Sequence, residues 1–145
     1  MTDITNLSTV NVAISNYIAV VTMNNPPVNA QNRQFHDDLT LAFDVLSDRN
    51  DVRSIVLTGA GKCFSAGADI KGRASQETDL GDHWVHSRRV RECFYAIMEC
   101  RKPVIAAING AALGAGLAVA ASADILIASE SASVGLPEIN VGLLG

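Results

Sequence analysis

Hydrophobic positions alternate with polar ones near the N-terminus and recur at helical spacing further along the chain. Residues 9–14 alternate, and a second strand-like run over residues 17–23 follows Ser15 and Asn16, which predicts a β-hairpin. Pro26 and Pro27 end that pattern. The apolar positions that follow have the spacing of an amphipathic helix: Phe35, Leu39, Ala42, Phe43 and Leu46.

Two β-branched runs and a second helical pattern complete the secondary-structure prediction. Residues 54–58 and 104–108 are short apolar runs typical of buried strands, and Pro103 precedes the second run. A helix is expected from about His83, and residues 73–82 are expected to form a loop. Its apolar positions are Trp84, Val90, Phe94, Ile97 and Met98. Strands that alternate with helices in this way predict an α/β fold.

Small residues directly follow both predicted strands. Residues 59–72 are rich in glycine and alanine, and residues 109–121 hold three Gly and six Ala, with a helix expected over 117–121. Backbone N–H groups at such turns are open to close approach and favour negative charge. We therefore expect one such N–H near Ala68 and another near Ala115 to hold a single carbonyl oxygen from two sides.

Glycine-rich turns also occur in proteins that bind no carbonyl oxygen. Glycine and alanine allow tight helix packing without any chemistry. A dinucleotide site is disfavoured because no acidic residue follows at the required distance, and a P-loop is excluded because Cys63 follows Gly61 and Lys62.

The same residues resemble the crotonase, or enoyl-CoA hydratase/isomerase, superfamily. Residues 64–70 resemble its first oxyanion-hole loop, and residues 102–116 resemble its second; residues 122–128 and 135–138 follow in the family order. The resemblance implies an α/β spiral of strand-strand-helix units with two roughly perpendicular sheets. It also implies an oxyanion hole formed by the N–H groups of Ala68 and Ala115.

The resemblance further implies an acyl-CoA thioester as substrate, with coenzyme A entering as part of it and no permanently bound cofactor or metal. Positions in or beside the two loops are expected to contact the substrate: Ala66, Asp69, Ile70, Lys71 and Gly114. Asp69 is also well placed to cap a helix. Relatives of this type assemble as homotrimers or dimers of trimers, and the same is expected here.

Glu138 is the expected base, because it follows Pro137 among apolar neighbours, where burial favours proton uptake by a carboxylate. The resemblance places a second catalytic glutamate at the position of Ala118, which cannot carry a proton. We therefore favour single-glutamate double-bond isomerisation. Two alternatives stay open: a hydratase with another acid, such as Asp69 or a histidine, in place of Ala118, and a non-catalytic acyl-CoA-binding protein.

Composition adds limits to this interpretation. The chain has 145 residues, 48% of them hydrophobic, which suits one core domain over residues 1–145. Its abrupt apolar end suggests an N-terminal fragment of a longer chain, with the family's C-terminal helical region missing. Three unpaired cysteines and no apparent leader or membrane segment favour a cytoplasmic protein. The net charge of −4 disfavours nucleic acid as a partner.

Overall fold

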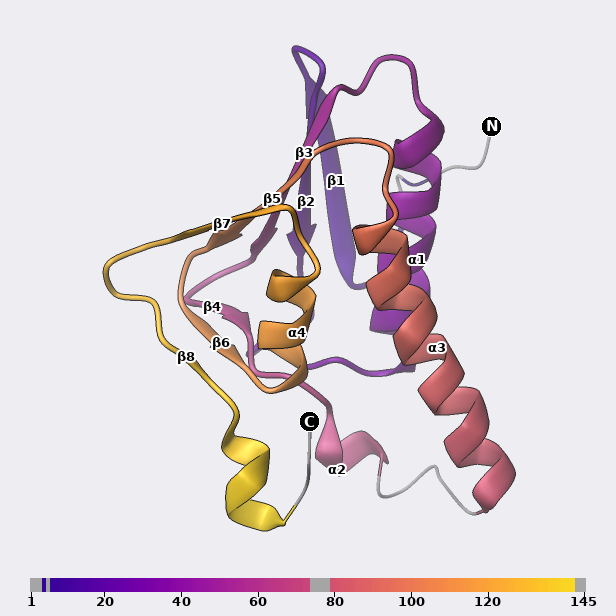
Figure 1. The fold of residues 1–145 in the computed structure, drawn as a ribbon, viewed down its shortest axis with the longest axis vertical. Helices are drawn as coiled ribbons and strands as arrows, with labels where there is room; N and C mark the ends of the chain where they lie inside the picture. Colours follow the sequence, from indigo (N-terminus) through magenta and orange to yellow (C-terminus); the bar gives the residue numbers. More distant parts are fainter. Residues whose placement is uncertain (1–3, 5, 74–78, 143–145) are drawn as a thin grey trace.

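The computed structural model describes residues 4, 6–73 and 79–142 (Figure 1). Its elements, in chain order, are β1 (Val10–Ser15), β2 (Ile18–Met23), α1 (Arg33–Asp48), β3 (Ser54–Gly59), β4 (Cys63–Ser65), α2 (Ile70–Arg73), α3 (Leu80–Met98), β5 (Val104–Ile108), β6 (Ala111–Leu113), α4 (Ala115–Ala121), β7 (Ile125–Ala128), β8 (Val134–Gly135) and the 3-10 helix η1 (Pro137–Val141).

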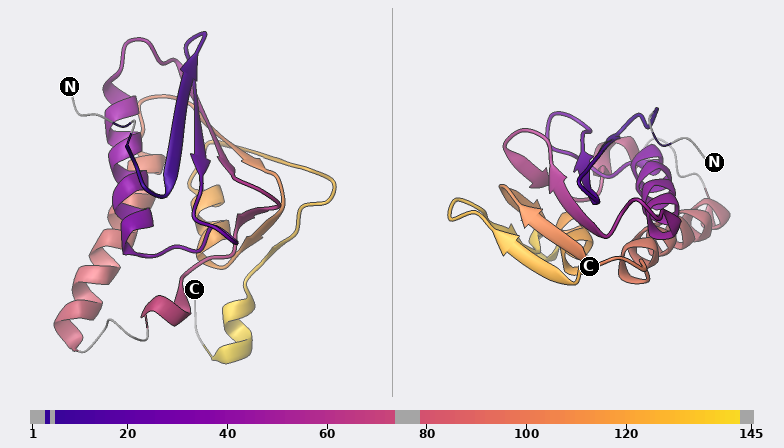
Figure 2. Two further views of the ribbon diagram at one scale, coloured as in Figure 1. Left: turned by 180° about the vertical axis from the view of Figure 1, so that it is seen from behind. Right: turned by 90° about the horizontal axis from the view of Figure 1, so that it is seen from above.

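The larger sheet has five strands in the order β1-β2-β3-β5-β7. The strands β1 and β2 form the predicted antiparallel hairpin, and the other neighbours pair in parallel. Asn16 and Tyr17 turn the hairpin with φ of 51° and 65°, a sign that a two-residue turn matches the twist of the strands. Both α1 and α3 lie on the same side of this sheet (Figure 2), where α1 packs on β1 and β2 and α3 packs on α1 and α4.

The second sheet is small and fully parallel, with the order β4-β6-β8. The short helix α4 lies between it and the larger sheet and contacts β4, β5 and β6. An α/β fold with two sheets is therefore confirmed. The core that joins the layers is built from side chains that are completely buried, among them Phe35, Phe43, Leu57 and Phe64.

Several boundaries differ from the sequence prediction. The helix α3 begins at Leu80 rather than near His83, because Asp79 caps it by accepting the N–H of Asp82 at 3.0 Å. The expected loop over 73–82 therefore shrinks, and residues 74–78 lie outside the described part of the chain. The helix α4 begins at Ala115, two residues before the expected start. The short strands β4, β6 and β8 were not predicted.

Part of the apolar face expected for α3 is exposed to solvent. Cys93 and Ile97 are buried, but Trp84 is 71% exposed and Met98 is 58% exposed. At the other edge of the molecule, the side chains of β7 are all exposed. Within the described residues, no helix is long and apolar enough to cross a membrane, and no cluster of metal-binding side chains is present.

Candidate active site

The small sheet brings together the three residues that were expected to do chemistry. Ala68 lies just after β4, Ala115 follows β6, and Glu138 lies just after β8. These strands are parallel neighbours, so the segments that leave their carboxyl ends emerge at one edge of the sheet. Strand order alone therefore gathers two backbone donors and one carboxylate.

Backbone pairing with Gln31 orients Ala68. The N–H of Gln31 donates to Gly67 O at 2.8 Å, and the N–H of Asp69 donates to Gln31 O at 3.0 Å. These two bonds use the residues on either side of Ala68, so the N–H of Ala68 itself faces away from Gln31. In the part of the chain that the structure describes, this N–H donates to no other residue.

Gly67 allows the two small-residue loops to approach each other. It has a φ of +88°, and a Cβ placed there would lie 2.6 Å from Leu113 O and 3.2 Å from Ala115 N. A side chain would therefore push the first loop away from the start of α4. The N–H of Ala115 belongs to the first residue of α4 and has no acceptor among the described residues.

The carboxylate of Glu138 lies directly against Gly114. A Cβ at Gly114 would fall 2.2 Å from Glu138 Oε1, and its φ of +55° is one that glycine adopts most readily. The segment that carries Glu138 is fixed by the N–H of Gly114, which donates to Gly135 O at 2.9 Å. Gly114 thus holds this segment through its backbone N–H, and its lack of a side chain leaves the space that the Glu138 carboxylate fills.

The burial of Glu138 has a different origin from the one expected. Its neighbours Leu136 and Ile139 are 58% and 78% exposed, so they do not enclose it. Contact with Gly114 does, and Glu138 Oε2 is buried without a hydrogen-bond partner among the described residues. An unpaired, buried carboxylate oxygen is uncommon and is a reasonable feature of a group that exchanges protons.

The other expected contact positions have varied surroundings. Asp69 caps α2, because its Oδ1 accepts the N–H of Gly72 at 2.9 Å. The N–H of Ala66 donates to Val28 O at 2.9 Å, and Ile70 is 61% exposed. The side chain of Lys71 lies outside the described part of the structure.

Ala118 lies within α4, where its N–H donates to Gly114 O at 3.1 Å. Its methyl group offers no proton and no hydrogen bond, so Ala118 supplies no second acid beside Glu138.

A buried network that the sequence did not predict supports the loop before Ala68. Gln31 Nε2 donates to Ser65 Oγ at 3.4 Å, and Ser65 Oγ donates to Asn29 O at 2.7 Å. Asn29 Nδ2 in turn donates to Cys63 O at 2.8 Å. The sequence signal was slight, because a polar stretch between a proline pair and a helix is typical of any turn.

His36 extends this network on its other side. It is only 2% exposed, and its Nε2 lies 3.3 Å from Gln31 Oε1. Burial, followed by the charge of nearby His86, lowers the pKa of His36 to about 4. Imidazole is therefore neutral here at physiological pH.

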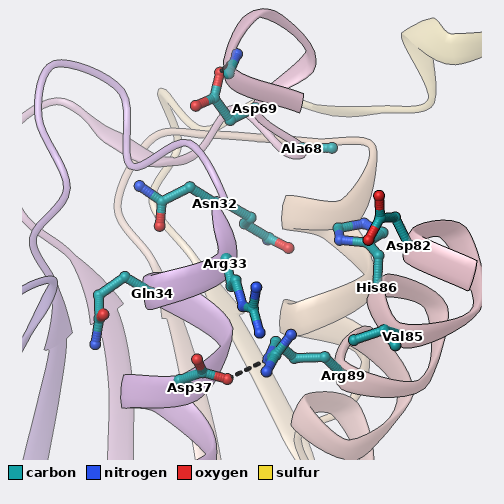
Figure 3. A pocket seen from close by; sticks show the side chains of 12 residues that line it. Asn32, Arg33, Gln34, Asp37, Ala68, Asp69, Asp82, Val85, His86 and Arg89 are labelled. Carbon is teal, nitrogen blue, oxygen red and sulfur yellow. Dashed lines mark hydrogen bonds and ion pairs between the residues drawn. The ribbon is translucent and has the colours of Figure 1, made fainter. Parts of the chain in front are cut away.

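A pocket of about 430 Å³ adjoins Ala68 on the side of α1 and α3 (Figure 3). His86 and Arg89, both from α3, line it. Arg89 forms an ion pair with Asp37 of α1. Figure 3 shows these side chains reaching from α3 toward α1.

Comparison with known proteins identifies a family that this chain matches. The family model described as enoyl-CoA hydratase/isomerase matches residues 13–145. A probable enoyl-CoA hydratase of Bacillus subtilis is 39% identical over 138 residues, which are 95% of this chain and 53% of that protein. A Mycobacterium tuberculosis protein named (7aS)-7a-methyl-1,5-dioxo-2,3,5,6,7,7a-hexahydro-1H-indene-carboxyl-CoA hydrolase is also 39% identical, over 88% of this chain and 51% of that protein.

Solved structures show the same similarity. Pseudomonas aeruginosa DspI superposes with a TM-score of 0.88 at 37% identity, over 97% of this chain and 57% of that one. An enoyl-CoA hydratase/carnithine racemase from Magnetospirillum magneticum gives a TM-score of 0.91 at 29% identity, over 97% and 53%. The chain thus spans about half the length of the relatives that it matches.

Proposed function

This chain belongs to the enoyl-CoA hydratase/isomerase family, and we propose that it carries the central catalytic groups of an enzyme that shifts a double bond in an acyl-CoA thioester. The observation that carries the proposal is the position of the Glu138 carboxylate against Gly114, one residue before the N–H of Ala115. A base and an oxyanion donor are thereby neighbours, which is what enolate chemistry requires.

In the proposed reaction, the N–H groups of Ala68 and Ala115 hold the thioester oxygen of a 3-enoyl-CoA. Glu138 removes a proton from the carbon next to the thioester, and the negative charge spreads over the thioester oxygen as a dienolate. The protonated Glu138 then returns the proton two carbons along, and the double bond moves beside the thioester. No water is consumed, so a single carboxylate is enough.

A hydratase is the second candidate, supported by the name of the Bacillus subtilis relative. Two relatives of equal identity carry the names hydratase and hydrolase, so membership of the family does not determine the reaction. Addition of water across a double bond is best served by two carboxylates, and Ala118 provides none. A hydratase would therefore need another acid, and a protein that binds acyl-CoA without turnover is the remaining alternative.

The test is incubation of the purified protein with a 3-enoyl-CoA and, separately, a 2-enoyl-CoA in water labelled with heavy oxygen. Isomerisation converts the first thioester into the second without incorporating label. Hydration instead yields a labelled 3-hydroxyacyl-CoA, and that product as the main one would refute the isomerase proposal. Glu138→Gln should lower turnover by about a hundredfold or more, whereas binding without turnover in both forms would identify a non-catalytic protein.

Ala118→Glu is the companion variant. If the protein lacks hydration only because an acid is absent, this substitution should create or raise hydratase activity. Circular dichroism must show an unchanged fold, because a carboxylate among the alanines of α4 risks an unpaired buried charge.

A further inference from the structure

Ser65 contacts both loops of the candidate oxyanion hole. It is the last residue of β4 and is completely buried. Its Oγ accepts the N–H of Gly67, the residue before Ala68, at 3.3 Å. Its backbone lies against α4, because a Cβ added to Gly116, the residue after Ala115, would fall 2.2 Å from Ser65 O. One residue thus contacts the immediate neighbours of both proposed donors.

The single hydrogen of the Ser65 hydroxyl is committed to Asn29. Ser65 Oγ lies 2.7 Å from Asn29 O, a carbonyl oxygen that can only accept a hydrogen bond. The lone pairs of Oγ therefore remain for donors, and two donors reach them: the N–H of Gly67 and Gln31 Nε2, the latter at 3.4 Å. One hydrogen and two lone pairs are then all in use, so the hydroxyl has one defined orientation.

Gln31 and His36 hold the hydroxyl in this orientation. Because the NH2 group of Gln31 faces Ser65, its Oε1 faces His36, whose Nε2 lies 3.3 Å away and must donate. His36 Nδ1 has no hydrogen-bond partner among the described residues, which agrees with a proton on Nε2. All three residues are 2% exposed or less, so bulk water offers them no alternative partners.

The peptide unit between Gly67 and Ala68 needs such support. Glycine rotates more freely than other residues, and a peptide bond is planar, so rotation about the Cα–C bond of Gly67 turns the N–H of Ala68 with it. The carbonyl of this unit accepts the N–H of Gln31 at 2.8 Å. Ser65 Oγ holds the N–H of Gly67, which belongs to the preceding peptide unit. The two bonds together restrain both backbone torsions of Gly67.

We propose that Ser65 is a positioning residue for the candidate oxyanion hole. Its hydroxyl fixes the direction of the Ala68 N–H, and its backbone sets the separation of that N–H from Ala115 at the start of α4. The inference rests on the proposed function, because it takes these two N–H groups as the donors to the thioester oxygen. A displaced donor costs mainly reaction rate, because charge on that oxygen develops in the transition state.

Infrared difference spectroscopy of a bound thioester measures this positioning directly. The probe is butanoyl-CoA with carbon-13 at the thioester carbonyl, and it has no double bond to move. Hydrogen bonds to a carbonyl oxygen weaken the C=O bond and lower its stretching frequency. We expect a lower frequency in the wild-type complex than for the thioester free in water, and in Ser65→Ala a return part of the way toward the free value.

Steady-state kinetics with a 3-enoyl-CoA give the second readout. Ser65→Ala should lower kcat about tenfold and change KM by less than about threefold, because the weakened interaction is made mainly in the transition state. A variant that was merely less stable would instead contain less active protein. Calorimetric titration with butanoyl-CoA counts the binding sites, so kcat is expressed per functional site.

Thr9→Val is the matched control. Thr9 Oγ1 donates to Asp38 Oδ2 at 2.8 Å, so this variant also removes a buried side-chain hydroxyl, but one that does not bond to the loop of Ala68. It should leave the carbonyl frequency and kcat unchanged. Gln31→Met is the second test variant, used where Ser65→Ala does not fold. It removes one of the three partners of Ser65 Oγ and should move the frequency in the same direction.

The outcomes separate this inference from the proposed function. If butanoyl-CoA does not bind, or its carbonyl frequency in the wild-type complex equals the free value, the proposed function is wrong and this inference with it. If the wild-type shift is present and Ser65→Ala retains it in full, or Gln31→Met does so where Ser65→Ala does not fold, only the positioning role of Ser65 is wrong. An equal loss of the shift in Thr9→Val would also overturn that role, because any lost buried hydrogen bond would then have the same effect.

Discussion

Protonation of His36 should destabilise the fold at mildly acidic pH. This imidazole is 2% exposed, and its Nδ1 has no hydrogen-bond partner among the described residues. Burial and the neighbouring charges of His86 and Arg89 lower its pKa to about 4 from 6.5, and Asp37 opposes them in part. The pKa of His36 is lower in the folded state than in the unfolded state. This group therefore does not reduce the stability of the fold above about pH 6.5, and it reduces that stability progressively as the pH falls toward about 4.

The magnitude follows from the two pKa values. At pH 5, His36 is almost fully protonated in the unfolded chain and hardly protonated in the folded chain. This difference lowers the free energy of unfolding by about 2 kcal/mol. At pH 7 the same term is close to zero. A loss of this size is a large fraction of the total stability of a typical domain.

Urea denaturation of the purified protein and of His36→Gln at both pH values measures this term. The wild-type protein should lose about 2 kcal/mol more than the variant between pH 7 and pH 5, since glutamine cannot be protonated. Other titrating groups cancel in the comparison, and His83→Gln, an exposed position, serves as the control. Equal pH dependence in wild type and His36→Gln would refute the reasoning.

Three further outcomes are expected. Gly114→Ala should lower turnover at least about tenfold, because the new Cβ would lie 2.2 Å from Glu138 Oε1 and displace this carboxylate. Gly61→Ala is the control, since Gly61 has a similar φ of +73° but no atom within 4 Å of the added Cβ. Steady-state kinetics should show lowered turnover in the first variant only. Asn29→Ala should cost about 1–3 kcal/mol in urea denaturation, because its amide donates to Ala60 O, Cys63 O and Phe64 O. Burial raises the pKa of the Cys93 thiol to about 12, so iodoacetamide at pH 8 should modify Cys93 only after denaturation, as mass spectrometry will show.

Local sequence patterns were sufficient for the hairpin, for β3 and β5, and for the first helix. The hairpin of β1 and β2 follows from the alternation of residues 9–14 and the strand-like run after it, and α1 follows from apolar residues that the structure buries completely, such as Phe35 and Leu39. The α3 pattern was less reliable, because only Cys93 and Ile97 of this helix are buried and Trp84 is not. A helix that packs mainly on another helix needs only a narrow apolar stripe.

Long-range contacts could not be predicted in the same way. Gln31 and His36 are polar residues near a helix start, and nothing in their spacing indicates that the fold buries both to 2% exposure. Glu138 was predicted as a base, but its enclosure comes from Gly114, more than twenty positions earlier, rather than from its apolar neighbours. Such contacts depend on strand order, which local patterns do not encode.

The three short strands explain why the sequence indicates the turns around the candidate site but not the sheet that carries them. Strands β4, β6 and β8 have three, three and two residues, which is too short for any periodic signal. The turns after these strands can be recognised from the sequence, because a close approach of two backbones requires glycine or other small residues, as at Gly67 and Gly114. The same requirement links the parts of the site to one another. A side chain at Gly67 would separate the loop of Ala68 from α4, and one at Gly114 would displace Glu138, so the small residues set the distances between the groups proposed to act on the thioester.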